Sequence, residues 1–188
     1  KKGLSLAYAL SPTGADHMEA PHDPLYAGFH PQGHPMGPLG LIEPLDPLAL
    51  DAKKVRAFFE TQKLWSAYNS VGMCDFVGAP LNGLEMEPLV SYLNAVTGWN
   101  VSLYELLKVG ERNNTLARVF NAREGFTPED DVLPQRLHEG IGNGPLKGQK
   151  IDPDEFFAAR RVYYEMAGWD PVSGAPTATK LAELGIGT

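Results

Sequence analysis

Hydrophobic residues recur every three or four positions over several stretches of this 188-residue chain. The clearest case is residues 51–71, where this spacing predicts one helix with a single buried stripe. The stripe comprises Val55, Phe58, Phe59, Gln62, Trp65 and Asn69. Further helices are expected at 4–10, near 86–96 and at about 178–184. No stretch alternates hydrophobic and polar residues as a strand does, so the pattern predicts an all-α, multihelical fold.

Helix-start signals support this pattern in the second half of the chain. Ser102-Leu103-Tyr104-Glu105 is a capping box, and it predicts a helix that runs to about residue 124 before a glycine. Thr127-Pro128-Glu129-Asp130 and Asp152-Pro153-Asp154-Glu155 repeat a cap followed by proline and an acidic residue. The second of these opens a helix that ends at Gly168, and Trp169 then falls at the hydrophobic position of a Schellman turn.

Residues 20–49 lack both helical and strand periodicity and are rich in Pro, Gly and His. We expect a long irregular loop here within a single domain that spans residues 1–188. Loops of this length are usually functional or mobile. This one is expected to cover a functional face or a neighbouring subunit, and a poorly ordered insertion is the alternative.

Composition narrows the class of protein. The net charge of −7 argues against nucleic-acid binding, which needs clustered Lys and Arg. No apolar run of about 18 residues is present to span a membrane. The single cysteine rules out an internal disulfide framework and is compatible with a reducing cytoplasm, which is the expected location. The first residues do not resemble a signal peptide, and the absence of an initial Met indicates a fragment.

Cys74, the only cysteine, comes just after the predicted helix of residues 51–71. Gly72 allows the chain to turn there because glycine accepts a left-handed conformation, and we expect Asn69 and Cys74 to point inward together. Three roles are open for Cys74: a small buried core residue, a nucleophile paired with His17 or His22, or one ligand of an iron–sulfur cluster. In the last case the other three ligands come from outside this chain.

The segment from Asp16 to Asp23 holds two histidines and three carboxylates. This composition makes it a candidate site for a divalent metal. The spacing of His17 and His22 is poor for a shared helix face, so a polar loop with capped helix ends is the preferred interpretation. The sequence does not assign roles to His22, His30 and His34.

The segment Asn69-Ser70-Val71-Gly72-Met73-Cys74 resembles the Asp-x-x-Gly-Leu-Cys motif of the tungsten-dependent aldehyde ferredoxin oxidoreductases. The resemblance implies that Asn69 and Met73 contact a pterin of the tungsten cofactor, with Asp75 also at the cofactor. It implies that Cys74 is the last metal ligand of a [4Fe-4S] cluster. Asn69 replaces the family's Asp, and its amide keeps hydrogen-bonding groups without the charge.

The segment of residues 11–18 is similar to a family segment that ends in a histidine of the substrate pocket. The resemblance implies that His17 is catalytic, and an imidazole suits proton transfer near neutral pH. Thr13 and Glu19 fall on positions where a family Arg and Lys contact the cofactor. Both are therefore expected to be cofactor-binding positions, although two positive charges that would help to neutralise the pterin phosphates are lost.

Residues 110–136 and 163–177 also resemble the C-terminal part of this family. The resemblance runs nearly from end to end and corresponds to the last third of a typical member. It implies missing N-terminal domains that carry a pterin-binding fold and the other cluster cysteines. Charged residues in these stretches are expected to form structural ion pairs. They are Glu111, Arg112, Arg118, Arg123, Asp130 and Asp131.

Together, the resemblance implies the C-terminal helical domain of a bis-pterin iron–sulfur oxidoreductase that uses tungsten or molybdenum. The expected reaction is oxidation of an aldehyde to a carboxylic acid, with ferredoxin or an electron-transfer subunit as acceptor. This chain alone is expected to be inactive, and a homodimer is one possible assembly. Reduction of an aromatic-acid thioester of the benzoyl-CoA type is the enzymatic alternative. A non-catalytic helical scaffold is the other.

Overall fold

The computed structural model describes residues 1–28, 36–78 and 83–187, and the described parts are helical without a β-strand. The α-helices are α1 (Leu4–Leu10), α2 (Asp23–Ala27), α3 (Ala52–Ser70), α4 (Met86–Thr97), α5 (Leu103–Arg123), α6 (Pro153–Ala167) and α7 (Ala178–Glu183). Two short 3-10 helices are η1 (Gly37–Leu39) and η2 (Gln135–His138). The all-α prediction is confirmed. His30 and His34 lie outside the described residues.

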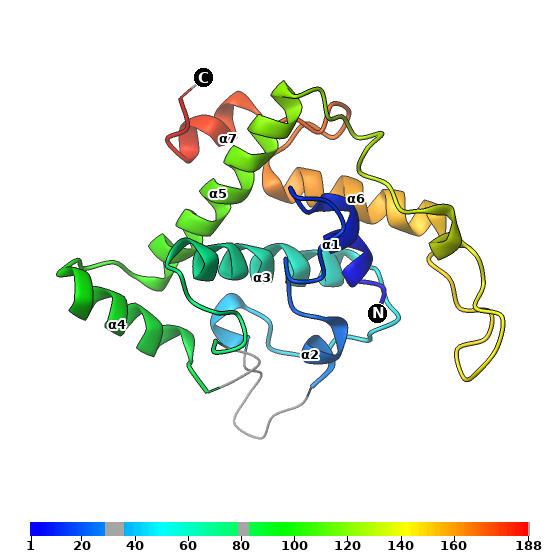
Figure 1. Ribbon diagram of the computed structural model, residues 1–188, viewed down its shortest axis with the longest axis horizontal. Coiled ribbons are helices and arrows are strands. Elements are labelled where there is room, and N and C mark those ends of the chain that lie inside the picture. The colour runs from blue at the N-terminus through cyan, green and yellow to red at the C-terminus, as the bar shows by residue number, and fades with distance from the viewer. Residues whose placement is uncertain (29–35, 79–82, 188) are drawn as a thin grey trace.

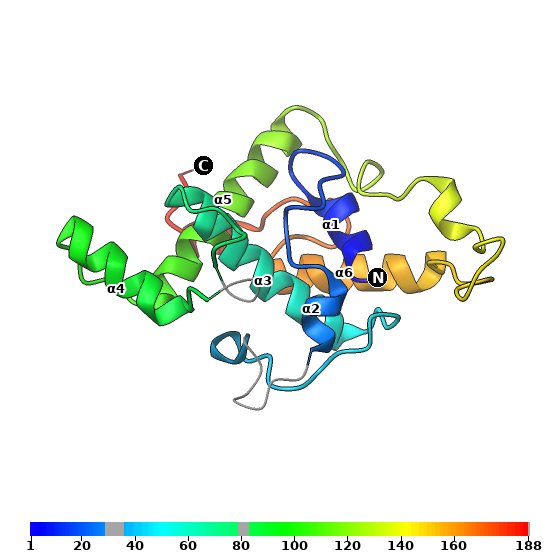
Figure 2. The same ribbon diagram turned by 60° about the horizontal axis from the view of Figure 1, so that its bottom comes forward.

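Helix α3 runs through the middle of the molecule and organises the packing around it (Figure 1). It packs against both α5 and α6, and α1 lies against α3 and α6 (Figure 2). Helix α4 stands at the side of the molecule and contacts α5. No helix in the described ranges combines the length and apolarity that a membrane crossing requires.

The predicted stripe of α3 is buried along most of its length. Val55, Phe58 and Trp65 belong to two hydrophobic clusters, one shared with α1 and α6 and the other with α2, α4 and α5. Asn69, at the last turn, is exposed. The stripe was therefore predicted one turn too long, because α5 and the two clusters cover the helix only as far as Tyr68.

Helices α3 and α5 cross at Gly110. A Cβ atom added to Gly110 would lie 1.9 Å from the carbonyl oxygen of Lys63, on the backbone of α3. Only a residue without a side chain permits this approach. The crossing brings the next turns of α5 against α3, so it sets the position of the polar residues that α5 presents further along.

A fully buried ion pair fixes the start of the chain. The ammonium of Lys54 lies 2.6 Å from Oδ1 of Asp23, and both side chains are inaccessible to solvent. The Asp23 carboxylate also accepts hydrogen bonds from the amides of Gly3 and Leu4, at 2.9 and 3.0 Å. These contacts join α1, α2 and α3, so the loop of residues 11–22 is anchored at both of its ends.

The helix-start predictions have different outcomes. Ser102 and Glu105 form the predicted capping box at the start of α5, and Asp152 caps α6. The prediction at Thr127 is wrong, since residues 127–130 form a turn. Asp130 does bond back to the amide of Thr127 at 2.8 Å. The turn does not continue into a helix because Asp131 pairs with Arg118 and Leu133 packs in the core.

Two further expectations need correction. The apolar side of α5 is only partly buried, because Leu116 and Phe120 are exposed while Leu106 is buried. The loop expected at 20–49 is not wholly irregular, since it contains α2 and η1. Proline at the first turn and Asp23 favour the short helix α2 even though no hydrophobic periodicity announces it.

Candidate functional site

Most of the predicted site residues lie on two loops that meet beside α3. One is residues 11–22, between α1 and α2, and the other is residues 71–78, after α3. His17 of the first loop and Phe76 of the second line the same cavity. The fold therefore brings together two segments that are about fifty residues apart in the sequence.

Three predicted cofactor positions line one cavity of about 480 Å³, which we call the amide cavity. They are Thr13 and Glu19 from the first loop and Asn69 from the end of α3. The rest of its lining comes from α3, α5 and the start of the loop. These residues are Pro12, Ser66, Asn113, Asn114, Ala117, Phe120 and Asn121. The volume is within the usual range for small-molecule sites.

The asparagines of α5 were not predicted as site residues. Asn114, Ala117 and Asn121 are three and four residues apart, so they share one face of the helix. The amide of Asn113 donates to Ser66 Oγ at 2.9 Å, and that of Asn121 donates to the carbonyl of Pro12 at 2.9 Å. The signal in the sequence was two asparagines that lie three residues before and four residues after an alanine, and hence on the same face of the helix predicted to end near residue 124.

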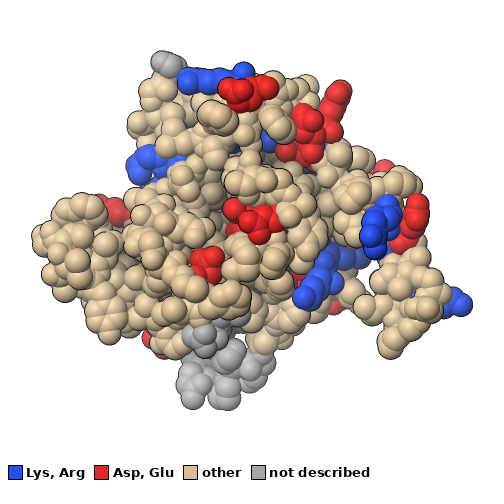
Figure 3. All heavy atoms as spheres, in the orientation of Figure 1, with Lys and Arg blue, Asp and Glu red and all other residues tan. Residues whose placement is uncertain are grey.

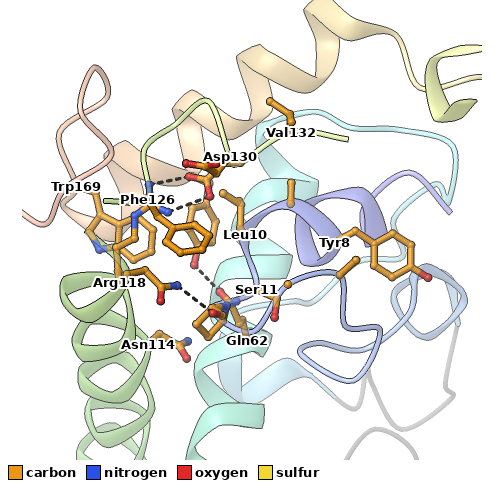
Figure 4. Close-up of a pocket in the computed structure, with 17 residues that line it drawn as sticks. Tyr8, Leu10, Ser11, Gln62, Asn114, Arg118, Phe126, Asp130, Val132 and Trp169 are labelled. Atoms are coloured by element: carbon orange, nitrogen blue, oxygen red, sulfur yellow. Dashed lines mark hydrogen bonds and ion pairs between the residues drawn. The ribbon is translucent and has the colours of Figure 1, made fainter. Parts of the chain in front are cut away.

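A second cavity of about 270 Å³ adjoins the amide cavity, and the two share Pro12, Asn114 and Asn121 (Figure 4). Arg118 lies at its edge and pairs with Asp131 at 2.7 Å. The Arg118 guanidinium also donates to the carbonyl of Gly174 at 2.8 Å. These contacts tie the segment around Gly174, after α6, to α5, so Arg118 and Asp131 have the structural role expected of them.

His17 lines a third cavity, of about 350 Å³, with His22, Trp65 and Phe76 among its other residues. The rings of His17 and His22 are 5.8 Å apart. Nε2 of His22 lies 3.1 Å from the backbone carbonyl of His17, and Nδ1 lies 3.3 Å from the ammonium of Lys1. His22 therefore donates through Nε2 and accepts through Nδ1, and it holds the backbone that carries His17.

Cys74 follows a Schellman turn at the end of α3. The amide of Met73 donates to the carbonyl of Tyr68, the amide of Gly72 donates to that of Asn69, and Gly72 has a φ of 72°. The predicted turn is confirmed, but the inward direction is wrong, because Asn69 and Cys74 are both exposed. Exposure also contradicts the buried-core interpretation of Cys74. No hydrogen bond joins Cys74 to a histidine within the described part of the chain.

Met73 and Asp75 flank Cys74 and are less accessible. Met73 packs against the hydrophobic cluster at the end of α3. Asp75 is buried, and its Oδ1 atom has no hydrogen-bond partner in the described structure. Burial, together with the nearby Asp16 carboxylate, raises the pKa of Asp75 to about 6. Burial and the charges of Asp16 and Asp75 likewise raise the pKa of Glu19.

The two loops thus carry three neighbouring carboxylates: the charges of Asp16 and Asp75 act on Glu19, and the charge of Asp16 acts on Asp75. Acidic patches lie near the middle of the face in Figure 3, where uncharged side chains otherwise predominate. Within residues 1–28, 36–78 and 83–187, no group of three His, Cys, Asp or Glu side chains has the geometry to hold a metal ion.

Comparison with known proteins supports the resemblance found in the sequence. A family model described as aldehyde ferredoxin oxidoreductase, domains 2 and 3, matches residues 1–186. The chain belongs to this family. The tungsten-containing aldehyde ferredoxin oxidoreductase of Pyrococcus furiosus is 33% identical over 163 residues, which are 85% of this chain and 26% of that protein. The corresponding enzyme of Thermococcus kodakarensis is 32% identical over the same shares.

Two other proteins with different descriptions are also similar to this chain, one in sequence and one in fold. The WOR-like subunit of an aliphatic sulfonate oxidoreductase from Pyrococcus furiosus is 32% identical over 64% of this chain and 19% of its own length. The active-site complex BamBC of benzoyl coenzyme A reductase, solved with 1,5-dienoyl-CoA, has the same fold. The TM-score of this match is 0.68, and the two sequences are 17% identical. The match covers 98% of this chain and 30% of the other.

The chain spans about a quarter of the length of the curated relatives that it matches (26%). Other domains of the same enzyme are therefore implied. Those relatives contain tungsten, and the family is one of oxidoreductases.

Proposed function

We propose that this chain is the helical C-terminal part of a tungsten or molybdenum bis-pterin, iron–sulfur oxidoreductase that oxidises aldehydes to carboxylic acids. One observation carries the proposal. Thr13, Glu19 and Asn69, which the resemblance assigns to the cofactor, come from separate segments and line one cavity. His17, assigned to the substrate, lines a separate cavity of about 350 Å³ and belongs to the same loop as Thr13 and Glu19.

The amide cavity fits the ring of a pterin better than its phosphate. Asparagine amides offer both donors and acceptors, which suits the polar atoms around a pterin ring. No Lys or Arg lines the cavity to neutralise a phosphate. Asn69, Met73, Asp75, Thr13 and Glu19 are the residues that would surround the cofactor. When bound, the metal–pterin centre supplies the two-electron redox chemistry.

Cys74 would hold one iron of the [4Fe-4S] cluster through its thiolate. Its exposure supports this assignment, because a ligand to a cluster shared with other domains must lie at the surface of this one. Phe76, directly after it, is 55% exposed. An apolar ring beside the thiolate would exclude water once the remaining domains cover this surface.

His17 would hold or move a proton in the substrate cavity. Converting an aldehyde and water to a neutral carboxylic acid releases two electrons and two protons. A [4Fe-4S] cluster held in part by Cys74 would supply one-electron transfer to ferredoxin or to an electron-transfer subunit. His17 has an exposed ring next to the apolar side chains of Trp65 and Phe76, and His22 fixes its backbone. This position suits a proton-transfer group whose ring remains free to turn.

The remaining assignments follow from the same proposal. The enzyme is expected to be cytoplasmic and to need its N-terminal domains for activity, and a homodimer is one possible assembly. The most detailed part of the proposal is the identity of the substrate. Relatives named for aldehydes and for aliphatic sulfonates both match this chain at about one-third identity. We choose aldehydes because those relatives match 85% of the chain rather than 64%.

Metal analysis and electron paramagnetic resonance of the natural full-length protein, purified without oxygen, test the proposal. We expect tungsten or molybdenum, pterin, and the spectrum of a reduced [4Fe-4S] cluster, with aldehyde-dependent reduction of ferredoxin. Cys74→Ser is expected to bleach or convert the cluster and to stop electron delivery, because serine offers a harder oxygen ligand.

An unaltered cluster spectrum with a normal ferredoxin-linked rate in Cys74→Ser would overturn the cluster assignment. A full-length protein without metal or pterin would instead favour the scaffold alternative. Activity with an aromatic thioester but with no aldehyde would favour the reductase. The isolated 188-residue chain is expected to carry neither tungsten nor cluster.

A further inference from the structure

The second cavity described above, of about 270 Å³, has no part in the proposed chemistry. Its lining comes from α1, α3, α5, α6 and the segment of residues 126–132, and we call it the Gln62 cavity (Figure 4). Phe126 and Asp130 are exposed, whereas Gln62 and Tyr163, which also line it, are each only 1% exposed. The cavity therefore leads from the surface to buried side chains.

The amide of Gln62 is only half satisfied by the protein. Its Oε1 atom accepts a hydrogen bond from the hydroxyl of Tyr163, and its Nε2 atom has no partner within the described residues. Nε2 is not one of the unpartnered polar atoms that are sealed inside this part of the chain, so it opens onto the cavity. The opposite orientation of the amide would deprive the buried Tyr163 proton of its acceptor. Buried polar groups are normally satisfied, so this N–H₂ group marks the point where a ligand would accept a hydrogen bond.

The charges that line the cavity are already compensated or solvated. Arg118 pairs with Asp131 and donates to the carbonyl of Gly174. Asp130 is exposed and accepts hydrogen bonds from the amide and hydroxyl of Thr127, at 2.8 and 3.3 Å. Among the described residues of the lining, no unpaired cation remains to hold an anion, and Asp130 would repel one. A cation would gain little from a carboxylate that water already reaches. The cavity therefore suits an uncharged ligand.

Apolar groups form much of the remaining wall. They include Leu10, Phe126 and Val132, together with the ring of Tyr163. A buried water needs two to four polar partners, which such walls do not offer, so a ligand with an apolar body would displace water favourably. The volume lies just below about 300 Å³, the lower end for drug-sized ligands, so the ligand is small.

We propose that the Gln62 cavity is a second ligand site, which binds a small uncharged carbonyl compound with its oxygen on Nε2 of Gln62. The apolar body of the ligand would contact Leu10, Phe126 and Val132. Asn114 also lines the cavity and makes no side-chain hydrogen bond within the described residues, so its amide offers a further donor and acceptor. The site shares no lining residue with the cavity of His17, and it needs neither metal nor pterin.

Two measurements on the natural full-length protein test this assignment. Crystals soaked with 4-bromobenzamide locate the probe through the anomalous scattering of its bromine, and a fluorine NMR titration with 4-fluorobenzamide measures its affinity in solution. We expect the bromine in the Gln62 cavity and the probe's carbonyl oxygen within hydrogen-bond distance of Nε2. The charged probes 4-bromobenzoate and 4-bromobenzylamine have nearly the same shape, and neither should occupy the cavity.

Gln62→Met keeps the length of the side chain and removes the donor. We expect it to weaken the affinity for 4-fluorobenzamide by about 5-fold or more, the scale of a hydrogen bond. Gln135→Met is the matched control, because Gln135 is exposed and lies outside the cavity lining, and it should keep the wild-type affinity. Thermal unfolding verifies that Gln62→Met is folded, since this change also removes the acceptor of Tyr163.

A second variant keeps the test decisive if Gln62→Met does not fold. Phe126→Ala removes an apolar wall at a residue that is 52% exposed, so the fold should be retained while the affinity falls several-fold. Phe157→Ala is its control, because Phe157 is 42% exposed and lies outside the lining. Its affinity should equal that of the wild-type protein.

Ordered water alone in the cavity of the soaked crystal would overturn the proposal. So would a probe seen in the crystal without binding in solution, which is binding at crystal concentration only. Equal occupation by 4-bromobenzoate or 4-bromobenzylamine would overturn the uncharged class of ligand. Wild-type affinity in the folded Gln62→Met variant or in Phe126→Ala would place the bound probe elsewhere. None of these results bears on the metal and pterin content that tests the proposed function.

Discussion

The helical body and the two site loops satisfy their polar groups in different ways. In the body, formed by α1, α3, α5 and α6, the buried charges are paired, as in Lys54 with Asp23 and Arg118 with Asp131. One neutral group just after α6, the indole N–H of Trp169, is buried without a hydrogen-bond partner in the described structure. At the loops, the side chains of Glu19 and of Asn69, which lies in the last turn of α3, lack protein partners in the described structure, and Cys74 is exposed. The body pairs its buried charges internally, whereas the loops place Asp75 Oδ1 in a buried position without a partner and present Cys74 at the surface.

The largest expected effect on the body comes from Gly110→Ala. The added Cβ would meet the backbone of α3 at 1.9 Å, and backbone cannot yield as a flexible side chain can. We expect the free energy of unfolding, measured by urea denaturation of the 188-residue chain, to fall by about 3 kcal/mol or more.

Gly142→Ala is the matched control, since nothing lies within 4 Å of its added Cβ. It should change the free energy of unfolding by less than about 0.5 kcal/mol. Equal stability of the two variants would show that α3 and α5 do not approach each other as closely as described.

Gly110→Ala is expected to lower stability, whereas a substitution at His17 in the loop of residues 11–22 should lower turnover without lowering stability. His17→Ala in the full-length enzyme is expected to reduce turnover by about 10²-fold, the scale of a general acid or base. Its metal and pterin content and its unfolding temperature should remain at wild-type values, because the His17 ring is exposed.

His22→Ala provides the comparison within the same loop. His22 contacts the backbone of His17 and not its ring nitrogens, so we expect a smaller loss of turnover. Wild-type turnover in His17→Ala would reduce His17 to a structural residue.

Asp75 lies where a site loop meets the body, and its buried carboxyl predicts a pH dependence. Its pKa is raised to about 6 from 3.8, so between these values the folded protein holds a proton that the unfolded chain has lost. The contribution of Asp75 to stability is thus fully present below about pH 4 and is lost as the pH rises through about 6.

Asp75→Asn removes this charge while it keeps the shape of the side chain. Above pH 7 the variant should be about 2 kcal/mol more stable than the wild-type chain, and the difference should vanish below pH 4. Urea unfolding of the 188-residue chain between pH 4 and 8 measures this. A constant difference across that range would mean that Asp75 is not the titrating group.

The sequence predicted the body better than the loops because different physical information specifies them. The spacing of Val55, Phe58 and Trp65 and the caps at Ser102 and Asp152 are local signals, so the helices followed from them. The resemblance supplied the loop residues, but no pattern in the sequence shows that Glu19 and Asn69 line one cavity.

Local signals also failed where tertiary contacts decided. The end of the α3 stripe at Asn69 was misjudged because burial there depends on how far the neighbouring helices extend. The asparagines of α5 escaped notice because they border the cavity only after α3 and α5 have crossed at Gly110. Such sites require the packing of distant segments and cannot be derived from periodicity.

The smallest predicted effect is on stability, and it concerns helix-cap residues. Similar cap sequences occur at Ser102, where a helix begins, and at Thr127, where none does. Ser102 accepts a hydrogen bond from the amide of Glu105 and begins the 21-residue helix α5. The amide of Thr127 donates to Asp130 as that of Ser102 does to Glu105, but Oγ1 of Thr127 accepts from the amide of Glu129, two residues on, and only a turn follows. Ser102→Ala leaves an amide of a packed helix without its partner and should cost about 1 kcal/mol. Thr127→Ala removes contacts within a short turn that no helix follows, so its cost should stay below about 0.5 kcal/mol. Thermal unfolding of both variants measures the difference, and equal costs would mean that the turn at Thr127 supports the body as much as the cap of α5 does.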